Sequence, residues 1–86
     1  MNLPRDVRIL IADDESGVRK VLEQVLRDDG FHTQLAADGR EALKLFEENP
    51  FLLVIADIVM PERDGIVLLL SIKALSPTTQ VIIITS

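Results

Sequence analysis

The chain has 86 residues, with 9 Lys and Arg against 14 Asp and Glu, which gives a formal net charge of −5. This length allows one domain, and the negative charge argues against direct binding to nucleic acid or to anionic membranes. The absence of cysteine excludes disulfides and thiolate metal sites. Because no apolar run approaches the ~20 residues of a membrane span, and residues 1–8 lack the apolar core of a secretory signal, we expect a cytoplasmic chain.

The first third of the sequence predicts a strand, a helix and a second strand. Val7–Ala12 is short, rich in β-branched residues and closed by two aspartates, which is typical of a strand. The next apolar residues recur with helical spacing: Val18, Val21, Leu22, Val25 and Leu26. Gly30 stands where a left-handed C-terminal cap belongs. Residues 31–36 alternate, with Phe31 on the apolar face and the only histidine, His32, on the polar face, which indicates a half-exposed edge strand.

A second helix is predicted from a capping signal. Asp38 and Glu41 are three residues apart, as in a capping box, with Asp38 as the N-cap. The buried stripe of this helix contains Ala42, Leu43 and Phe46. The helix should end near residues 49–50, where Asn and Pro follow one another.

The remaining elements are strongly apolar. Leu52–Ala56 is apolar on both sides of the pleat and is closed by Asp57, which indicates a strand in the middle of a parallel sheet. Ile66–Leu75 predicts a third helix, stopped by Ser and Pro at 76–77. Val81–Ile84 reads in the same way as a fully buried strand, followed by Thr85.

Strands that alternate with helices predict an α/β fold with a parallel sheet covered on both faces, here of the form (βα)3β. Right-handed crossovers limit the topology. The alternating second strand belongs at an edge, and the strands at 52–56 and 81–84 belong inside. These conditions predict the spatial order 2-1-3-4, with the direction of winding reversing between the first and third strands.

Three aspartates follow the two strands at this reversal. Asp13 and Asp14 follow the first strand and Asp57 the third. The carboxyl ends of parallel strands share one rim, where ligands bind, and neighbouring strands are about 4.8 Å apart. Carboxylates crowded in this way need a cation or shared protons, and hard oxygen ligands suit Mg²⁺ or Mn²⁺. Thr85 would add a hydroxyl at the same rim, and the combination suggests phosphoryl chemistry.

The aspartates and Thr85 also have a purely structural interpretation. Acidic residues at strand ends often serve only as N-caps of the next helix, and Asp14 or Ser16 could have that role. Thr85 could be no more than a residue that favours β-structure.

The chain resembles the receiver domain of two-component response regulators. The matching segments are 9–15, 57–65 and 81–86, and the middle segment carries the pattern D-x-x-M-P-x-x-D-G at every fixed position. The resemblance covers about residues 8–86. It implies that Asp57 is the phosphoacceptor and that Asp13 and Asp14 are the acidic pair, with Asp14 the more direct ligand of Mg²⁺. The backbone carbonyl of Val59 would complete the protein ligands, and Thr85 would be the switch hydroxyl.

The resemblance also implies a complete fold and a kind of partner. A complete receiver is a flavodoxin-like doubly wound sheet with five strands and five helices. We expect residues 1–86 to be an incomplete receiver domain without the fourth helix, the fifth strand with its terminal lysine, and the fifth helix. The expected partner is a sensor histidine kinase or a phosphotransfer protein, and the bare last strand should promote self-association.

Two other functions need motifs that the sequence lacks. A haloacid-dehalogenase-type phosphatase also uses an aspartyl nucleophile, but it needs Asp-x-Asp, and residues 57–59 are Asp-Ile-Val. A flavodoxin-like cofactor binder needs a Ser, Thr or Gly-rich phosphate loop, and residues 13–15 are all acidic. We therefore expect a signalling receiver and not an enzyme. A fragment that acts only in interaction or assembly, without phosphorylation, is the alternative that the sequence leaves open.

Overall fold

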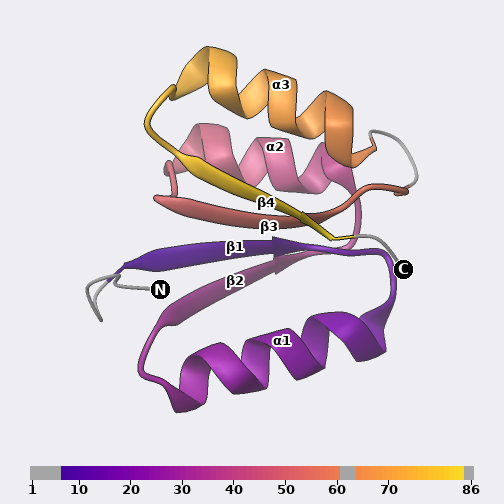
Figure 1. Ribbon diagram of the computed structural model, residues 1–86, viewed down its shortest axis with the longest axis vertical. Helices are drawn as coiled ribbons and strands as arrows, with labels where there is room; N and C mark the ends of the chain where they lie inside the picture. Colours follow the sequence, from indigo (N-terminus) through magenta and orange to yellow (C-terminus); the bar gives the residue numbers. More distant parts are fainter. Residues whose placement is uncertain (1–6, 61–63, 85–86) are drawn as a thin grey trace.

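The computed structural model describes residues 7–60 and 64–84. In this part of the chain, parallel strands form one sheet in the order β2-β1-β3-β4, connected by helices (Figure 1). The strands are β1 (Arg8–Ala12), β2 (His32–Ala36), β3 (Leu53–Asp57) and β4 (Gln80–Ile84). The helices are α1 (Ser16–Asp28), α2 (Gly39–Glu48) and α3 (Gly65–Leu75), and none of those described is long and apolar enough to cross a membrane. The predicted fold class, alternation and strand order are confirmed.

The central strands β1 and β3 are buried because helices cover both faces of the sheet. Helix α1 lies on one face, and α2 and α3 lie side by side on the other (Figure 1). Alternate strand residues therefore join two separate clusters. The cluster beneath α1 contains Ile9, Ile11, Leu53 and Ile55, and the cluster beneath α2 and α3 contains Leu10, Ala12, Val54 and Ala56. This double burial explains why both strands read as continuous apolar runs.

Helix α1 ends at Asp28, just before the predicted glycine. Gly30 has φ 93°, in the left-handed region where other residues are strained. Its N–H donates to the carbonyl of Arg27 at 2.9 Å, and the N–H of Phe31 donates to the carbonyl of Leu26 at 3.0 Å. This pair of bonds satisfies carbonyls that the helix leaves open and turns the chain into β2.

The two other helices begin at aspartate N-caps. The carboxylate of Asp38 accepts from the N–H of Glu41 at 2.8 Å, and that of Asp64 accepts from Val67 at 2.9 Å. The side chain of Glu41 accepts in turn from the N–H of Ala37 at 2.8 Å. The predicted capping box is thus confirmed with one difference. The side chain of Glu41 accepts from the N–H of Ala37, the residue before the N-cap, and not from the N–H of the N-cap itself.

The prediction that the strand at 81–84 is fully buried is wrong. Strand β4 pairs only with β3 and is the edge of the sheet among the described residues, and Ile82 is 38% exposed. Helix α3 is likewise less covered than its composition suggests, since Leu70 is 65% exposed. An unbroken apolar run shows that both faces of an element are apolar, but it does not show what covers them.

Candidate functional site

The carboxyl ends of β1 and β3 bring the candidate residues together. The strands pair in parallel with Ala12 opposite Ala56, so Asp13 and Asp57 leave the sheet at the same level and on the same rim. Asp14 follows in the β1–α1 connection. The strand order places no other strand between them, and this adjacency is the switch point of the topology.

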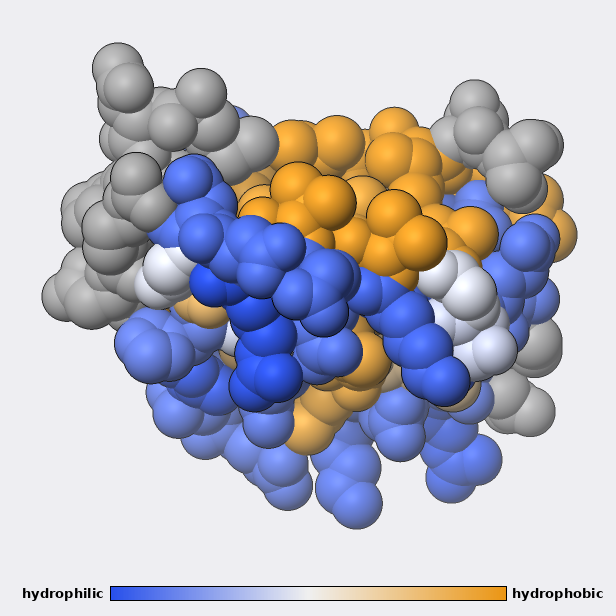
Figure 2. Space-filling model, turned by 90° about the horizontal axis from the view of Figure 1, so that it is seen from below, coloured by the Kyte–Doolittle hydropathy of each residue, from blue (hydrophilic) through white to orange (hydrophobic). Residues whose placement is uncertain are grey.

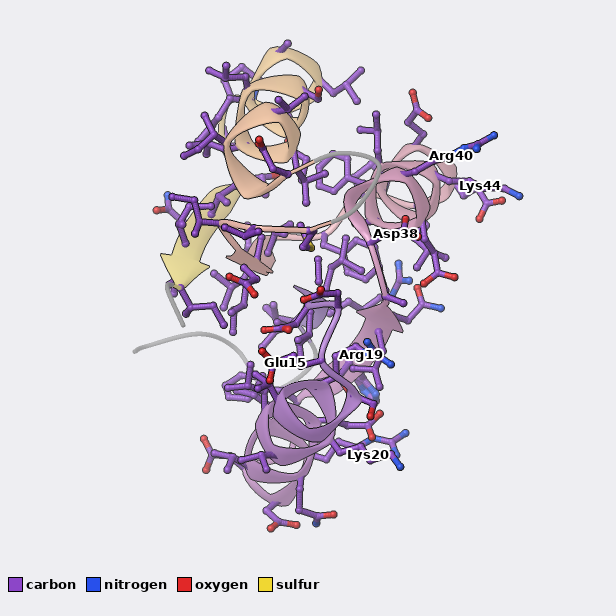
Figure 3. The ribbon with its side chains drawn as sticks, turned by 90° about the vertical axis from the view of Figure 1, so that its right-hand side faces the viewer. Glu15, Arg19, Lys20, Asp38, Arg40 and Lys44 are labelled. Carbon is purple, nitrogen blue, oxygen red and sulfur yellow. The ribbon has the colours of Figure 1, made fainter. Side chains whose placement is uncertain are left out.

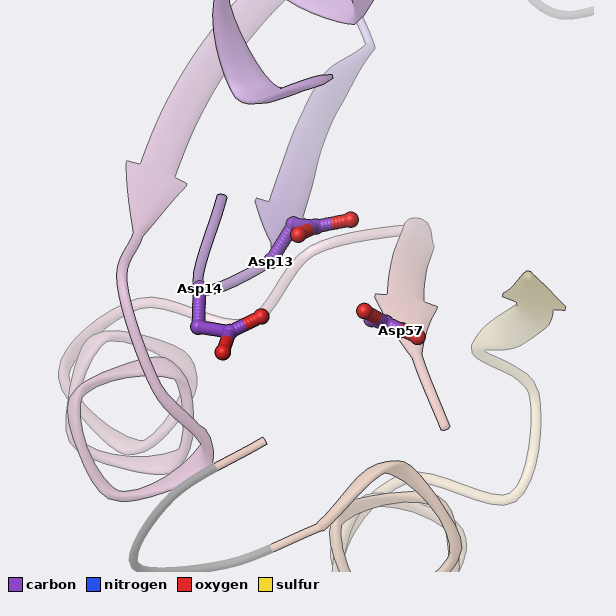
Figure 4. A group of neighbouring side chains, drawn as sticks. All are labelled: Asp13, Asp14 and Asp57. Atoms are coloured by element: carbon purple, nitrogen blue, oxygen red, sulfur yellow. The ribbon is translucent and has the colours of Figure 1, made fainter. Parts of the chain in front are cut away.

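The three carboxylates form one cluster. A carboxylate oxygen from each of Asp13, Asp14 and Asp57 lies within 4.8 Å of one from each of the others, and Figure 4 shows the side chains turned toward one another. Asp13 and Asp57 are each only 2% exposed, whereas Asp14 is exposed. Two of the three carboxylates are therefore withdrawn from solvent, and the third is accessible to it.

Asp13 is fixed by several hydrogen bonds. Its backbone N–H donates to the carbonyl of Ala36 at 3.1 Å, and its carboxylate accepts from the N–H of Glu15 at 2.8 Å. The guanidinium of Arg19 donates to its backbone carbonyl at 2.5 Å, and Figure 3 shows Arg19 on α1 close to the loop that carries Glu15. Sequence reasoning missed Arg19, since an arginine on the polar face of a helix is usually a solvated charge.

Asp57 is held by the loop that follows it. Its carboxylate accepts from the N–H of Val59 at 3.4 Å, and the N–H of Ile58 donates to the carbonyl of Ile84 at the end of β4 at 3.0 Å. The N–H of Gly65 donates to the carbonyl of Ile58 at 3.0 Å, so the start of α3 rests directly on this loop. The loop therefore connects Asp57 to both β4 and α3.

Gly65 is required here by close packing. A Cβ built on Gly65 would lie 2.9 Å from the carbonyl carbon of Asp57 and 2.9 Å from the Cα of Ile58, and closer still to the Asp57 carbonyl oxygen. Only a residue without a side chain lets α3 approach the end of β3 so closely. Asp64 caps α3, and Gly65 lets the start of this helix pack on the end of β3.

The capping alternative does not account for the acidic pair. The N-cap of α1 is Glu15, which makes no side-chain capping bond, and Ser16 is already the first helical residue. Asp14 is therefore neither in the cap position nor bonded as a cap. His32 is exposed on β2, as predicted. Thr85 lies outside the described residues, so its predicted place at the rim stays a prediction.

The donor set fits a hard divalent cation. Three carboxylates, two of them buried, converge on one point, and within residues 7–60 and 64–84 no lysine or arginine forms an ion pair with them. The guanidinium of Arg19 contacts a backbone carbonyl instead. Buried like charges repel one another, and Mg²⁺ accepts one or two carboxylates while it keeps several waters. The carboxylates of Asp13, Asp14 and Asp57 therefore suit Mg²⁺ at this rim.

Comparisons with known proteins show the family to which this fold belongs. The family model of the response regulator receiver domain matches residues 9–86, and the chain therefore belongs to this family of two-component signalling proteins. The transcriptional regulatory protein ZraR of Escherichia coli K12 is 41% identical over 81 residues, which are 94% of this chain and 18% of ZraR. The response regulator receiver protein CpdR of Brucella abortus is 37% identical over 91% of this chain and 65% of CpdR.

Solved structures show the same fold. A CheY-like receiver domain protein of Methanospirillum hungatei superposes with a TM-score of 0.90 at 32% identity, covering 93% of this chain and 64% of that one. The CheX-CheY-BeF3-Mg²⁺ complex of Borrelia burgdorferi matches with a TM-score of 0.87 at 34% identity, covering 92% and 61%. This chain thus spans about two thirds of the receiver chains it matches. It spans less than a fifth of ZraR.

Proposed function

We propose that Asp57 accepts a phosphoryl group, with Mg²⁺ or Mn²⁺ held by Asp13, Asp14 and Asp57. The observation that carries this proposal is the convergence of the three carboxylates within 4.8 Å. Asp57 is buried, as Asp13 is, and it ends the central strand β3, so its carboxylate is held in place from the backbone. A carboxylate in such a position can act as a nucleophile toward phosphorus.

The reaction is a transfer between two protein side chains. A carboxylate oxygen of Asp57 attacks the phosphorus of a phosphohistidine, a P–O bond forms, and the P–N bond to the histidine breaks, leaving an acyl phosphate. When bound, a divalent cation would offset the charge on the transferred group. Asp14, the exposed member of the cluster, would hold that cation directly, Asp13 would act through water, and the Val59 carbonyl would supply a further ligand. Thr85 provides the switch hydroxyl that responds to the phosphoryl group.

The proposed partner is a sensor histidine kinase or a phosphotransfer protein. The Borrelia burgdorferi relative was solved with CheX, BeF3 and Mg²⁺, which supports a receiver that works with a protein partner and a divalent cation. We propose a cytoplasmic signalling receiver domain over residues 1–86, not an enzyme with a separate substrate and without direct binding to nucleic acid or membranes. The chain would also associate with itself through β4.

Phosphorylation at a defined residue tests the function. The 86-residue chain is incubated with acetyl phosphate and MgCl₂, and the product is mapped by peptide mass spectrometry after reduction of the acyl phosphate with borohydride. We expect modification at Asp57 that depends on Mg²⁺ and is lost in Asp57→Asn. Asp38→Asn is the matched control, because Asp38 follows β2 at the same rim and asparagine also caps helices well. A phosphoryl group on another residue, or none in the folded parent chain, would refute the assignment.

A further inference from the structure

The side chain of Arg19 folds back along α1 to the end of β1. Its guanidinium donates to the backbone carbonyl of Asp13 at 2.5 Å, and Arg19 is itself half-buried. Its backbone N–H lies in the first turn of the helix and donates to the carbonyl of Glu15 at 3.1 Å. Figure 3 shows Arg19 beside the loop that carries Glu15. The side chain therefore joins the helix to the loop that holds the acidic pair.

This contact differs from what the surface of α1 would lead one to expect. Hydrophilic side chains are spread along the helix, and Figure 2 shows them on the face seen from below. The next residue, Lys20, is exposed, as cationic side chains on such a surface usually are. Arg19 instead directs its charged group to a neutral carbonyl. Because a hydrogen bond from an ionised donor is short and strong, this bond can hold the loop in one conformation.

The two peptide units that flank Asp13 are held from different elements. The unit before Asp13 donates its N–H to the carbonyl of Ala36, at the end of β2, at 3.1 Å. The unit after Asp13 contains the carbonyl that Arg19 bonds, together with the N–H of Asp14. Because a peptide unit is planar, the bond from Arg19 fixes the direction in which Asp14 leaves the strand. The Asp13 side chain is fixed separately, since its carboxylate accepts from the N–H of Glu15 at 2.8 Å.

The position of the Asp14 carboxylate depends on this backbone. Asp14 is exposed, and no hydrogen bond between residues of the described segments reaches its side chain. One of its carboxylate oxygens nevertheless lies within 4.8 Å of an oxygen of Asp13 and of Asp57. Mg²⁺ demands near-ideal octahedral geometry, so a rotation of the peptide unit between Asp13 and Asp14 would misplace one of its ligands.

We propose that Arg19 is a positioning residue for the cation site. Its bond to the Asp13 carbonyl sets the peptide unit between Asp13 and Asp14, and thereby the separation of their two carboxylates. This role rests on the proposed function, since it concerns the same Mg²⁺ site, but it does not depend on phosphoryl transfer. Arg19 orders the acidic pair through its backbone and leaves the carboxylates themselves to the cation.

The sign of the effect on Mg²⁺ binding separates positioning from charge. Arg19 places a positive charge close to a site for a cation, so removal of that charge alone should tighten Mg²⁺ binding. Loss of the bond to the Asp13 carbonyl should weaken it, because groups that orient metal ligands typically contribute about 10–100-fold to metal affinity. Lys20→Ala is the matched control, because it removes the same charge from the adjacent, exposed residue.

Titration with Mg²⁺, followed by amide chemical shifts of residues 13–16 and 57–60, measures the dissociation constant of each variant. We expect Arg19→Ala to weaken binding about tenfold, and Lys20→Ala to leave it unchanged or slightly tighter. Arg19→Lys should recover part of the loss, because it keeps a charged donor. Equal or tighter binding in Arg19→Ala than in a parent chain that binds Mg²⁺ would overturn the positioning role alone. A parent chain that binds no Mg²⁺ would instead refute the cation site itself, and the role of Arg19 with it.

Spectra of the metal-free chain test whether the effect arises at the proposed bond. In Arg19→Ala without Mg²⁺, the carbonyl carbon shift of Asp13 and the amide shift of Asp14 should both change, because one peptide unit carries both groups. In Lys20→Ala both should match the parent chain. Circular dichroism and urea unfolding would check the fold, and Arg19→Gln, which is neutral and shorter, should give the same result if the alanine variant does not fold. A variant that is less stable, yet keeps the parent's signals at these groups and its Mg²⁺ affinity, would show that Arg19 only braces the helix, and the proposal would be wrong.

Discussion

The substitution Gly65→Ala tests whether close packing of α3 against the end of β3 supports the acidic rim. The added Cβ would lie 2.9 Å from two backbone atoms of Asp57 and Ile58, and closer to the Asp57 carbonyl oxygen. These are backbone atoms of a buried strand end and its loop, so no side chain can rotate away to make room. The start of α3 must instead move away from β3, and the hydrogen bond from Gly65 to Ile58 must lengthen.

The expected cost follows from these contacts. Overpacking that forces backbone shifts costs about 1–3 kcal/mol. Replacing glycine by alanine returns about 0.4–1 kcal/mol by restricting the unfolded chain. We therefore expect Gly65→Ala to lower the free energy of unfolding by about 1–2 kcal/mol. The matched control is Gly17→Ala in α1, where an added Cβ has no neighbour within 4 Å and the change should stabilise the chain slightly.

Urea unfolding followed by circular dichroism measures both variants against the parent chain. Amide spectra should also show displaced signals for residues 57–60 in Gly65→Ala, because the strain falls on that loop, and none there in Gly17→Ala. If Gly65→Ala is as stable as Gly17→Ala, the close approach does not constrain this loop and the reasoning fails.

Two further changes test contacts outside the acidic cluster. Thr79→Val removes a buried hydroxyl that donates to the carbonyl of Phe51 at 2.9 Å. Because that carbonyl loses this donor, the free energy of unfolding in urea should fall by about 1–3 kcal/mol. Thr78→Val, at an exposed residue, should change it little. A loss as large in Thr78→Val would show that the hydrogen bond is not the cause. Asp38→Ala should lower stability by about 1 kcal/mol, because the N–H of Glu41 loses its acceptor, while Asp38→Asn should retain most of it. Equal losses in both variants would count against the cap.

The architecture could be predicted because each element carries a local signal. Gly30 marks the end of α1, Asp38 the start of α2, and the doubly apolar run at 52–56 marks β3 as central. Together with the rules for parallel sheets, these signals place Asp13 and Asp57 on one rim. The site follows from the topology, because an aspartate at the carboxyl end of a parallel strand lies at the rim of the sheet.

Exposure and long-range contacts could not be predicted in the same way. The run at 81–84 is as apolar as that of a central strand, and composition alone does not show that its side chains are partly exposed at the edge of the described sheet. The bond from Arg19 to the Asp13 carbonyl depends on how α1 docks on the sheet, which helical spacing does not specify. The need for glycine at residue 65 arises from the distance between α3 and β3, a property of the folded chain alone.

Titration of the chain with Mg²⁺, followed by amide chemical shifts, tests the central claim most directly. If Asp13, Asp14 and Asp57 form one cation site, signals of residues 13–16 and 57–60 should move together and give one dissociation constant, and Asp57→Asn should weaken both sets of shifts. Signals at the far ends of the strands should stay in place. Shifts confined to one of the two loops, or no shift in a folded sample at millimolar Mg²⁺, would show that the three carboxylates do not act as one site.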